Sequence, residues 1–538
     1  MTHSLRTFSL VLTLSLFFDV ATSQSPVPSR TWIVFQDRGS SAAQLQSASP
    51  NALGITERAL RRRAKVLQPG QLIDELDLPL TPEYLEAVRS TGATIHATSR
   101  WLNAVSVEAT PGQLQACLRL PFVQSTQPVA VFKKNRPDAS PTSFLEKGAT
   151  AASLDYGQSF TQLNNIKVVD VHNLGINGYG VIVGMVDDGY NNHRTHNALK
   201  NIDVLAEYDF VQRDSNTSRA SGEFFSQGNH GSYTLSALAG FDSGNLIGPA
   251  YGASLLLAKT EVDSVEVRVE EDLYVEGLEW LESLGADIVS SSLGYIDWYT
   301  YRDLDGKTAV TTKAALVAAR KGVLLVTAAG NEGNFRTFNP DSTGTLIAPA
   351  DADSIVTVGA VSSNGVLAGF SSTGPTFDGR IKPEVVAQGV SVYAANGASP
   401  SNYISVSGTS LSTPLTAGAA ALVLSAHPEL TPMQVREALL QTALRINDGT
   451  SRTTTYPNNF YGYGMVNALD AVLYHGIAFS SKPQVVVSGN QLTVTISIAS
   501  KASAPLVPDS LFMYYRTVPN SAFQRVNLTE TGQGNQYS

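Results

Sequence analysis

Cysteine is nearly absent from this chain of 538 residues: Cys117 is the only one, so no disulfide can form within the chain. Lys and Arg number 37 against 46 Asp and Glu, and the net charge of −9 argues against nucleic acid as a partner. Beyond residue 23, no apolar run approaches the roughly 20 residues that a membrane-spanning helix needs. We therefore expect a protein without a membrane partner once its N-terminal segment is removed.

Residues 1–23 have the three parts of a secretory signal. Arg6 supplies the positive start, residues 8–18 form an apolar core, and residues 21–23 offer a cleavage site of small residues. A membrane anchor is the alternative, but the apolar core is too short for one. We expect the protein to be secreted, either free outside the cell or associated with its surface.

Small residues surround one serine, Ser410, in the stretch 406–414, which then opens an alanine-rich apolar run. The alanines favour a helix, and Pro414 is tolerated because it lies in the first turn. A serine at a helix N-terminus feels the positive end of the helix dipole, which stabilises nearby negative charge. A simple serine N-cap is the alternative to a catalytic serine.

Three polar residues upstream favour the catalytic interpretation. Asp187 ends a predicted buried strand, His230 precedes a helix of small residues, and Asn331 follows a second buried strand. Open α/β sheets gather their sites where strands end and helices begin. A serine nucleophile needs a base, an acid that orients the base, and a donor for the oxyanion. His230, Asp187 and Asn331 can supply these in turn.

The order of these motifs resembles that of the subtilisin-like serine proteases (subtilases, peptidase family S8). The motifs are Asp187-Asp188-Gly189, Gly228-Asn229-His230-Gly231-Ser232, Ala328-Ala329-Gly330-Asn331-Glu332-Gly333 and Gly408-Thr409-Ser410. The resemblance implies a mainly parallel α/β sheet with helices on both faces. It implies catalysis by Asp187, His230 and Ser410, with Asn331 in the oxyanion hole. The substrate-binding residues that it implies are Ser292, Leu293, Gly294, Ala329 and Gly330.

Two positions depart from the family pattern. Asp188 stands where Thr or Ser is usual, and Tyr233 stands where a second His is usual. We expect catalysis to require no metal and no cofactor, and the sequence supports no structural calcium site. The small residues 328–330 predict a specificity pocket that is open to bulky side chains.

The pattern of predicted strands and helices divides the chain into three parts after the signal. Residues 24–148 alternate β, α, β, α, β, and this topology resembles the ferredoxin-like inhibitory propeptide of subtilases. Residues 149–477 form the peptidase. Residues 478–538 begin with a hairpin and add two strands, which predicts the start of a β-sandwich module, with a truncated module as one interpretation.

Charge also separates the first two parts. Residues 24–147 carry 14 Lys and Arg against 10 Asp and Glu, whereas residues 148–538 carry 22 against 35, so the two should associate. The run Arg61-Arg62-Arg63 fits such a contact or a solvated helix face equally well. Glu270-Glu271-Asp272 is expected to open a helix as a solvated first turn, and a contact with basic substrates is the alternative.

These patterns together predict a secreted serine endopeptidase that is made as a self-processing precursor. Its partners are a protein or peptide substrate and its own propeptide, and residues 134–153 form an exposed linker in which the first cut falls. An esterase is one alternative, but no Gly-x-Ser-x-Gly motif surrounds Ser410. A non-catalytic binding protein is the other, and the four filled catalytic positions argue against it.

Overall fold

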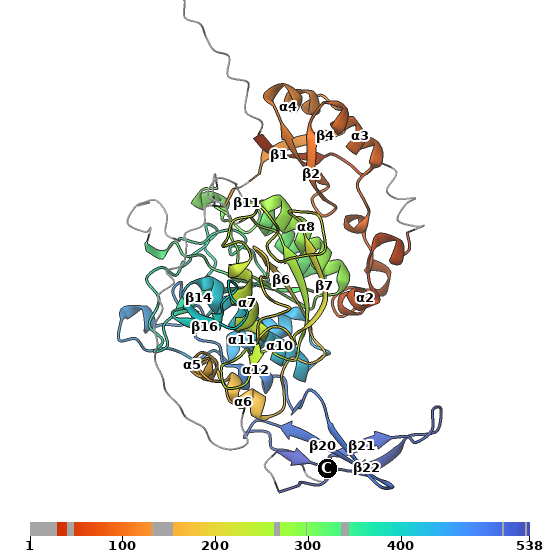
Figure 1. Cartoon of the computed structure of the whole chain (residues 1–538), viewed down its shortest axis with the longest axis vertical. Helices are drawn as coiled ribbons and strands as arrows, with labels where there is room; N and C mark the ends of the chain where they lie inside the picture. Colours follow the sequence, from red (N-terminus) through yellow and green to blue (C-terminus); the bar gives the residue numbers. More distant parts are fainter. Residues whose placement is uncertain are drawn as a thin grey trace, which may run out of the picture.

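The computed structural model shows the chain as three consecutive parts, one below the next in Figure 1. We call the described residues of 29–132, 154–477 and 478–538 the N-terminal, central and C-terminal parts. The structure describes residues 29–39, 48–129, 131–132, 154–262, 269–296, 299–334, 344–507, 510–532 and 535–538. The predicted signal and nearly all of the predicted linker lie outside these residues.

A parallel sheet of seven strands forms the middle of the central part, in the order β15-β14-β13-β12-β6-β10-β7. Its strands are β6 (Ile182–Asp187), β7 (Asp203–Asp209), β10 (Ser254–Lys259), β12 (Ile288–Ser291), β13 (Leu324–Ala328), β14 (Val356–Val361) and β15 (Val385–Gln388). Most of these strands are continuous apolar runs, because both faces of the sheet are covered. The α/β prediction is therefore confirmed.

Successive residues of one strand enter opposite cores, as the twofold repeat of a strand requires. Met185 packs in the cluster that includes α7 (Asn229–Ala239) and α10 (Thr409–Ala426). Val186 packs in the cluster that includes α8 (Glu271–Leu284) and α9 (Val310–Arg320). Within the described residues, α10 alone is long and apolar enough to cross a membrane, but 94% of it is buried inside the protein.

Shorter elements complete the central part. The helices are α5 (Phe160–Asn165), α6 (Val168–Asn173), α11 (Pro432–Gln441) and α12 (Ala468–Val472). The short strands are β8 (Phe241–Asp242), β9 (Leu246–Ile247), β11 (Val269–Glu270), β16 (Val392–Ala395) and β17 (Tyr403–Val406). Helix α11 begins with a capping box between Thr431 and Gln434, which satisfies two of its first N–H groups.

The N-terminal part is an antiparallel sheet of four strands in the order β2-β3-β1-β4, with two helices on one face. Its elements are β1 (Ser29–Phe35), α3 (Pro82–Ser90), β2 (Thr94–Ser99), β3 (Ala104–Ala109), α4 (Pro111–Leu118) and β4 (Val123–Pro128). This order is the ferredoxin-like one, so the predicted topology is confirmed. Strand β2 was not among the predicted strands.

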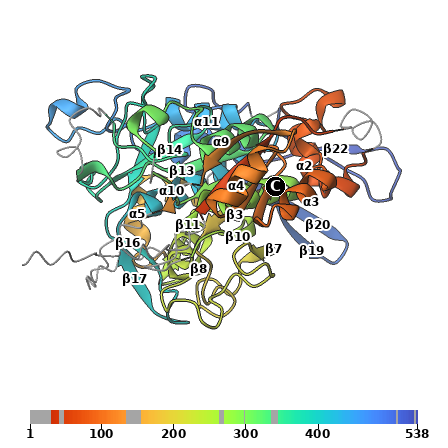
Figure 2. The same cartoon turned by 90° about the horizontal axis from the view of Figure 1, so that it is seen from above.

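An arm of about 30 residues, which we define as residues 48–78, leaves the N-terminal part between β1 and α3. It holds α2 (Glu57–Arg63) and three single turns, at Asn51–Leu53, Pro69–Gln71 and Glu75–Asp77. Figures 1 and 2 show α2 beside the central part, and its arginines contact Glu282 near the end of α8. The arm therefore reaches a second surface of the central part, away from the four-stranded sheet.

The C-terminal part consists of short antiparallel strands. These are β18 (Ala478–Phe479), β19 (Gln484–Ser488), β20 (Gln491–Ala499), β21 (Phe512–Tyr515), β22 (Gln524–Asn527) and β23 (Gln536–Tyr537). The predicted hairpin is present as β19 and β20, with Val485 opposite Val494. The region is β-rich, as predicted, and β19 is exposed along its length.

Candidate active site

Ser410 lies in the first turn of α10, where the chain leaves β17 and turns into the helix. Its side chain is nearly buried, with 4% of the residue exposed. Gly408 allows this turn, because a Cβ at that position would lie only 2.8 Å from Ser410 Oγ. The sequence therefore places one hydroxyl at the positive end of a long buried helix.

His230 is held by Asp187, which ends β6 at the carboxyl edge of the sheet. The His230 Nδ1 atom lies 2.6 Å from Asp187 Oδ1. Thr234 Oγ donates to the other carboxylate oxygen at 2.9 Å, and the Asp188 N–H donates to Asp187 Oδ1 at 2.8 Å. These contacts fix the carboxylate, which in turn fixes the tautomer and orientation of the imidazole.

Electrostatics keep Asp187 ionised. Burial alone raises its pKa, but the neighbouring His230 and the hydrogen bonds from Asp188 and Thr234 outweigh burial and hold the pKa below its usual range. The carboxylate consequently stays negative at neutral pH. It can stabilise the positive charge that the imidazole of His230 gains when it takes up a proton.

The two departures from the family pattern have local explanations. Asp188 accepts the N–H of Gly231 at 2.9 Å, which places a carboxylate at the N-terminus of α7, where the helix dipole favours it. Tyr233 points into the apolar cluster beside α10. Asp187, Asp188 and His230 have ligand atoms within 4.8 Å of one another, and they form the one such group in the described part of the chain. The contacts above already engage these three side chains.

Asn331 follows β13 and is oriented by the residue before the serine. Its Oδ1 accepts from the Thr409 N–H at 2.9 Å and from Thr409 Oγ at 3.1 Å. With the amide oxygen engaged, the Nδ2 group lies on the side of Gly408, where a Cβ would be 3.8 Å away. The amide can therefore donate a hydrogen bond beside the nucleophile.

Two segments flank the nucleophile, one after β12 and one after β13. Ser292 Oγ donates to the backbone oxygen of Ser410 at 2.8 Å, so the segment Ser292–Gly294 lies against α10. Ala329 and Gly330 precede Asn331, and the carbonyl of Gly330 accepts from the Ser372 N–H at 2.9 Å. The structure thus gathers every predicted site residue at one edge of the sheet.

The sequence analysis did not predict the contributions of three residues to this site. These are Asp188, whose carboxylate binds the start of α7, Thr234, which donates to Asp187, and Ile347, which packs against Gly294 and Gly330. Thr234 carries a usable signal, because it lies four residues after His230 and so shares its helix face. Ile347 carries none, since it comes from a loop after residues 335–343 and reaches the site only through the fold.

The end of the N-terminal part approaches the same edge of the sheet. Strand β5 (Val131–Phe132) pairs antiparallel with β11, which leads directly into α8. Strand β10, which lies next to β6 in the sheet, ends at this edge with Lys259. The segment after β4 has therefore joined the central part as an added strand.

Helix α8 is the acidic surface against which the N-terminal part docks. Glu279 accepts from Ser99 Oγ at 2.5 Å and from the N–H groups of Arg100 and Trp101 at 3.2 Å. Asp272 accepts from Arg30 at 2.9 Å. The expectation that Glu271 and Asp272 form a solvated helix start is wrong, because both are fully buried. Association of the basic segment with the acidic body is borne out at these contacts.

The arm settles the two interpretations of the arginine run. Arg61 is solvated, with 69% of its side chain exposed, whereas Arg62 and Arg63 are buried. Arg63 pairs with Glu282 at 2.6 Å and with Asp77 at 2.9 Å. Arg62 pairs with Glu282 and also donates to the Ala286 carbonyl at 2.7 Å, beyond the last turn of α8.

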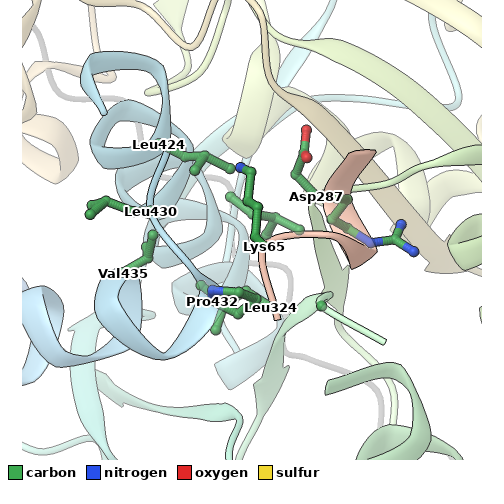
Figure 3. A pocket seen from close by; sticks show the side chains of 10 residues that line it. Lys65, Asp287, Leu324, Leu424, Leu430, Pro432 and Val435 are labelled. Atoms are coloured by element: carbon green, nitrogen blue, oxygen red, sulfur yellow. The ribbon is translucent and has the colours of Figure 1, made fainter. Parts of the chain in front are cut away.

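A pocket lies next to the arm, at the opposite edge of the sheet from Ser410 (Figure 3). Lys65 of the arm lines it together with Asp287, and Leu424, Leu430 and Val435 form its apolar side. Ile288 and Leu324, which begin β12 and β13, also line it. The arm therefore covers apolar surface of the central part as well as pairing with its carboxylates.

We predict that the arm stabilises the precursor through Arg63 rather than Arg61. Arg63→Ala removes the arginine that Glu282 and Asp77 share and leaves these buried carboxylates with only Arg62 and Lys321 as cationic partners. Breaking a buried ion pair typically costs up to about 3–5 kcal/mol. Arg61→Ala, its matched control two residues away, should change the free energy of unfolding little. Denaturant unfolding of the full chain with Ser410→Ala as background measures both; equal effects would contradict the prediction.

The sequence of this chain matches known families over both its N-terminal and its central part. The model of the subtilase family matches residues 178–464, and the model of the peptidase S8 propeptide domain of Bacteroidota matches residues 30–143. Subtilisin DY of Bacillus licheniformis is 34% identical over 304 residues, which cover 56% of this chain and 94% of that protein. Subtilisin E of Bacillus subtilis is 32% identical over 321 residues, covering 59% and 71%. Serine protease AprX of the same species is 30% identical over 340 residues, covering 58% and 70%.

Proposed function

Because the chain belongs to the subtilase family, whose members are serine endopeptidases, we propose that Ser410, His230 and Asp187 act together to hydrolyse peptide bonds. The observation that carries the assignment of roles is the 2.6 Å contact between His230 Nδ1 and Asp187. It leaves Nε2 of the imidazole as the nitrogen that can face the nucleophile. The reaction uses side chains and water, so it requires no metal and no cofactor.

Hydrolysis proceeds in two halves. His230 removes the proton of Ser410 Oγ as the oxygen attacks the scissile carbonyl, and it then protonates the leaving amine. In the second half, His230 removes a proton from water as the water attacks the acyl-enzyme, and it returns the proton to Ser410 Oγ as the acid product leaves. Asp187 remains ionised throughout and stabilises the imidazolium that forms in each half. Asn331 and the N–H of Ser410 donate to the oxyanion.

The substrate backbone binds as an extended strand along Ser292, Leu293 and Gly294. Its scissile carbonyl then lies between Ser410 and Asn331, and the segment Ala329–Gly330 borders the side chain next to that carbonyl. A protein or peptide is the substrate class, because strand pairing recognises backbone amides.

Labelling with an active-serine phosphonate tests the assignment. The wild type should be labelled on Ser410 and should cleave a protein substrate, and Ser410→Ala should do neither. A wild type that is labelled but hydrolyses simple esters and no protein substrate would support the esterase alternative. An unlabelled wild-type chain that still binds peptides would support a non-catalytic binding protein.

Activity should fall as the pH decreases through the neutral range. His230 must be neutral to act as the base, and an unperturbed histidine titrates near ~6.5. Asp187, whose own pKa is lowered, stays negative and favours charged His230, so the loss of activity begins at or above that pH. Activity persists on the alkaline side. A profile of kcat/KM against pH measures this, and an optimum near ~4 would rule out His230 as the base.

We also propose that the N-terminal part inhibits the enzyme and is removed by the enzyme itself, and that the protein is secreted. Support for inhibition comes from β5, which pairs with the chain beside the site, and from the match of residues 30–143 to a propeptide. Support for secretion comes from residues 1–23 and from the named subtilisins. N-terminal sequencing of protein recovered outside the cell tests removal of the signal.

A further inference from the structure

The side chain of Ile347 lies between the two segments that flank the nucleophile. A Cβ added to Gly294 would overlap Cδ1 and Cγ1 of Ile347, and one added to Gly330 would lie 3.0 Å from its Cγ1. The isoleucine thus packs directly against the backbone of both glycines. Ile347 therefore fills the space that Gly294 and Gly330 leave between the two segments.

The backbone around Ile347 is held in register with these segments. The Ile347 N–H donates to the Ala329 carbonyl at 3.3 Å, and the next residue, Ala348, exchanges hydrogen bonds of 2.8 and 3.0 Å with Tyr295. Ile347 is 8% exposed, so its side chain is almost fully enclosed. These bonds fix the backbone that carries the side chain, and the close packing around the side chain leaves it little room to change rotamer.

A bound substrate directs one of its side chains toward the space that Ile347 fills. If the scissile carbonyl lies between Ser410 and Asn331, the P1 residue, which carries that carbonyl, is the one whose side chain enters between the two segments. Gly294 is two residues from Ser292, which contacts Ser410, and Gly330 adjoins Asn331. A P1 side chain larger than that of alanine or serine therefore meets Ile347.

We propose that Ile347 determines specificity by restricting P1 to small residues, namely glycine, alanine and serine. The proposal rests on the proposed function of Ser410 and names its substrate class. It replaces the sequence-based expectation of an open pocket, which considered residues 328–330 without their neighbour. Close-packed side chains leave no room for a second one, and forcing it in displaces backbone.

The precursor contains a natural test of this preference. Its linker offers large residues at Phe144 and Leu145, and only Gly, Ala, Thr and Ser over residues 148–153. A site that accepts small P1 residues cuts after one of the small residues and passes over Phe144 and Leu145. N-terminal sequencing of the processed chain identifies the bond.

The decisive experiment compares tetrapeptide amides that differ only at P1, with Ala or Phe there. The wild type should show a kcat/KM at least about tenfold higher for Ala, which is the size of effect that one or two methylene groups produce in a pocket. Ile347→Gly should raise kcat/KM for Phe by about tenfold or more while retaining cleavage after Ala. Ile347→Ala, which disturbs the backbone less, should give an intermediate change.

Leu346→Val is the matched control, because Leu346 packs in the core cluster of α8 and α9 and should leave the P1 preference unchanged. Phosphonate labelling counts intact sites in every variant, so a misfolded variant is recognised. A wild type that cleaves equally well after Phe and Ala, or an Ile347→Gly variant with an unchanged preference, would overturn the proposal. Absence of labelling and hydrolysis in the wild type would instead refute the proposed function.

Discussion

Replacing Ser410 with alanine should leave the chain as an uncut precursor when it is expressed alone, while the wild type becomes shorter by the N-terminal part. Removal of the nucleophile of a Ser-His-Asp protease lowers turnover on the order of a millionfold, so no cut should be detectable. Gel mobility and mass spectrometry of the two purified chains give the answer directly.

The cut should be intramolecular. Residues 134–153 can extend up to about 65 Å, enough for some part of them to enter the site from β5, which already lies beside it. A tethered substrate has a high effective concentration, so the fraction processed in a given time should not depend on the enzyme concentration. Dilution over a hundredfold range separates this from cutting of one molecule by another.

Ser412→Ala is the matched control for this experiment. Ser412 is buried in the same helix, and its Oγ donates to the Thr409 carbonyl at 2.9 Å, within the first turn. Its loss should leave processing intact. If purified Ser410→Ala is still cut within the linker with no other protease present, self-processing is wrong, whatever the role of Ser410 toward other substrates.

Two separate contacts should keep the propeptide bound after the proposed cut. The sheet of the N-terminal part docks on Glu279 of α8, and the arm docks on Glu282, one turn further along the same helix. Neither contact includes the linker. Cleavage of the linker therefore leaves both contacts in place, and release of activity should follow a second event, such as degradation of the bound propeptide.

The site could be predicted from the sequence because its chemistry follows from strand ends and helix starts. Asp187, Asn331 and Ser410 each adjoin a long apolar run whose secondary structure is legible, and parallel strands bring such ends to one edge. The local sequence pattern was therefore sufficient to predict that these three residues lie at one edge of the sheet. The family resemblance added the roles.

Contacts between distant segments could not be predicted in the same way. Arg63 and Glu282 are 219 residues apart, and nothing near either residue indicates the other. Acidic residues at a helix start usually face water, so the burial of Asp272 depends on Arg30 of another part of the chain. Strand β2 escaped prediction because its sequence mixes threonine, histidine and serine with few strongly apolar residues.

Asn331→Leu should reduce kcat by about a hundred- to a thousandfold with little change in KM, which is the typical cost of removing one oxyanion donor. Leucine has a similar size but cannot donate a hydrogen bond. The donated bond forms mainly in the transition state, where the carbonyl oxygen carries negative charge, so substrate affinity should change little. Steady-state kinetics on a peptide amide, normalised to the phosphonate-labelled fraction, measure both constants.

Thr409→Val separates the loss of the donor from a disturbed loop. This change removes the contact of Thr409 Oγ with Asn331 but keeps the Thr409 N–H, which still orients the amide oxygen at 2.9 Å. We expect Thr409→Val to retain most of the activity that Asn331→Leu loses. If kcat of Asn331→Leu is unchanged, Asn331 has no part in the reaction. If the two variants lose activity equally, the role of Asn331 is to hold the loop, and the oxyanion must rely on backbone donors such as the N–H of Ser410.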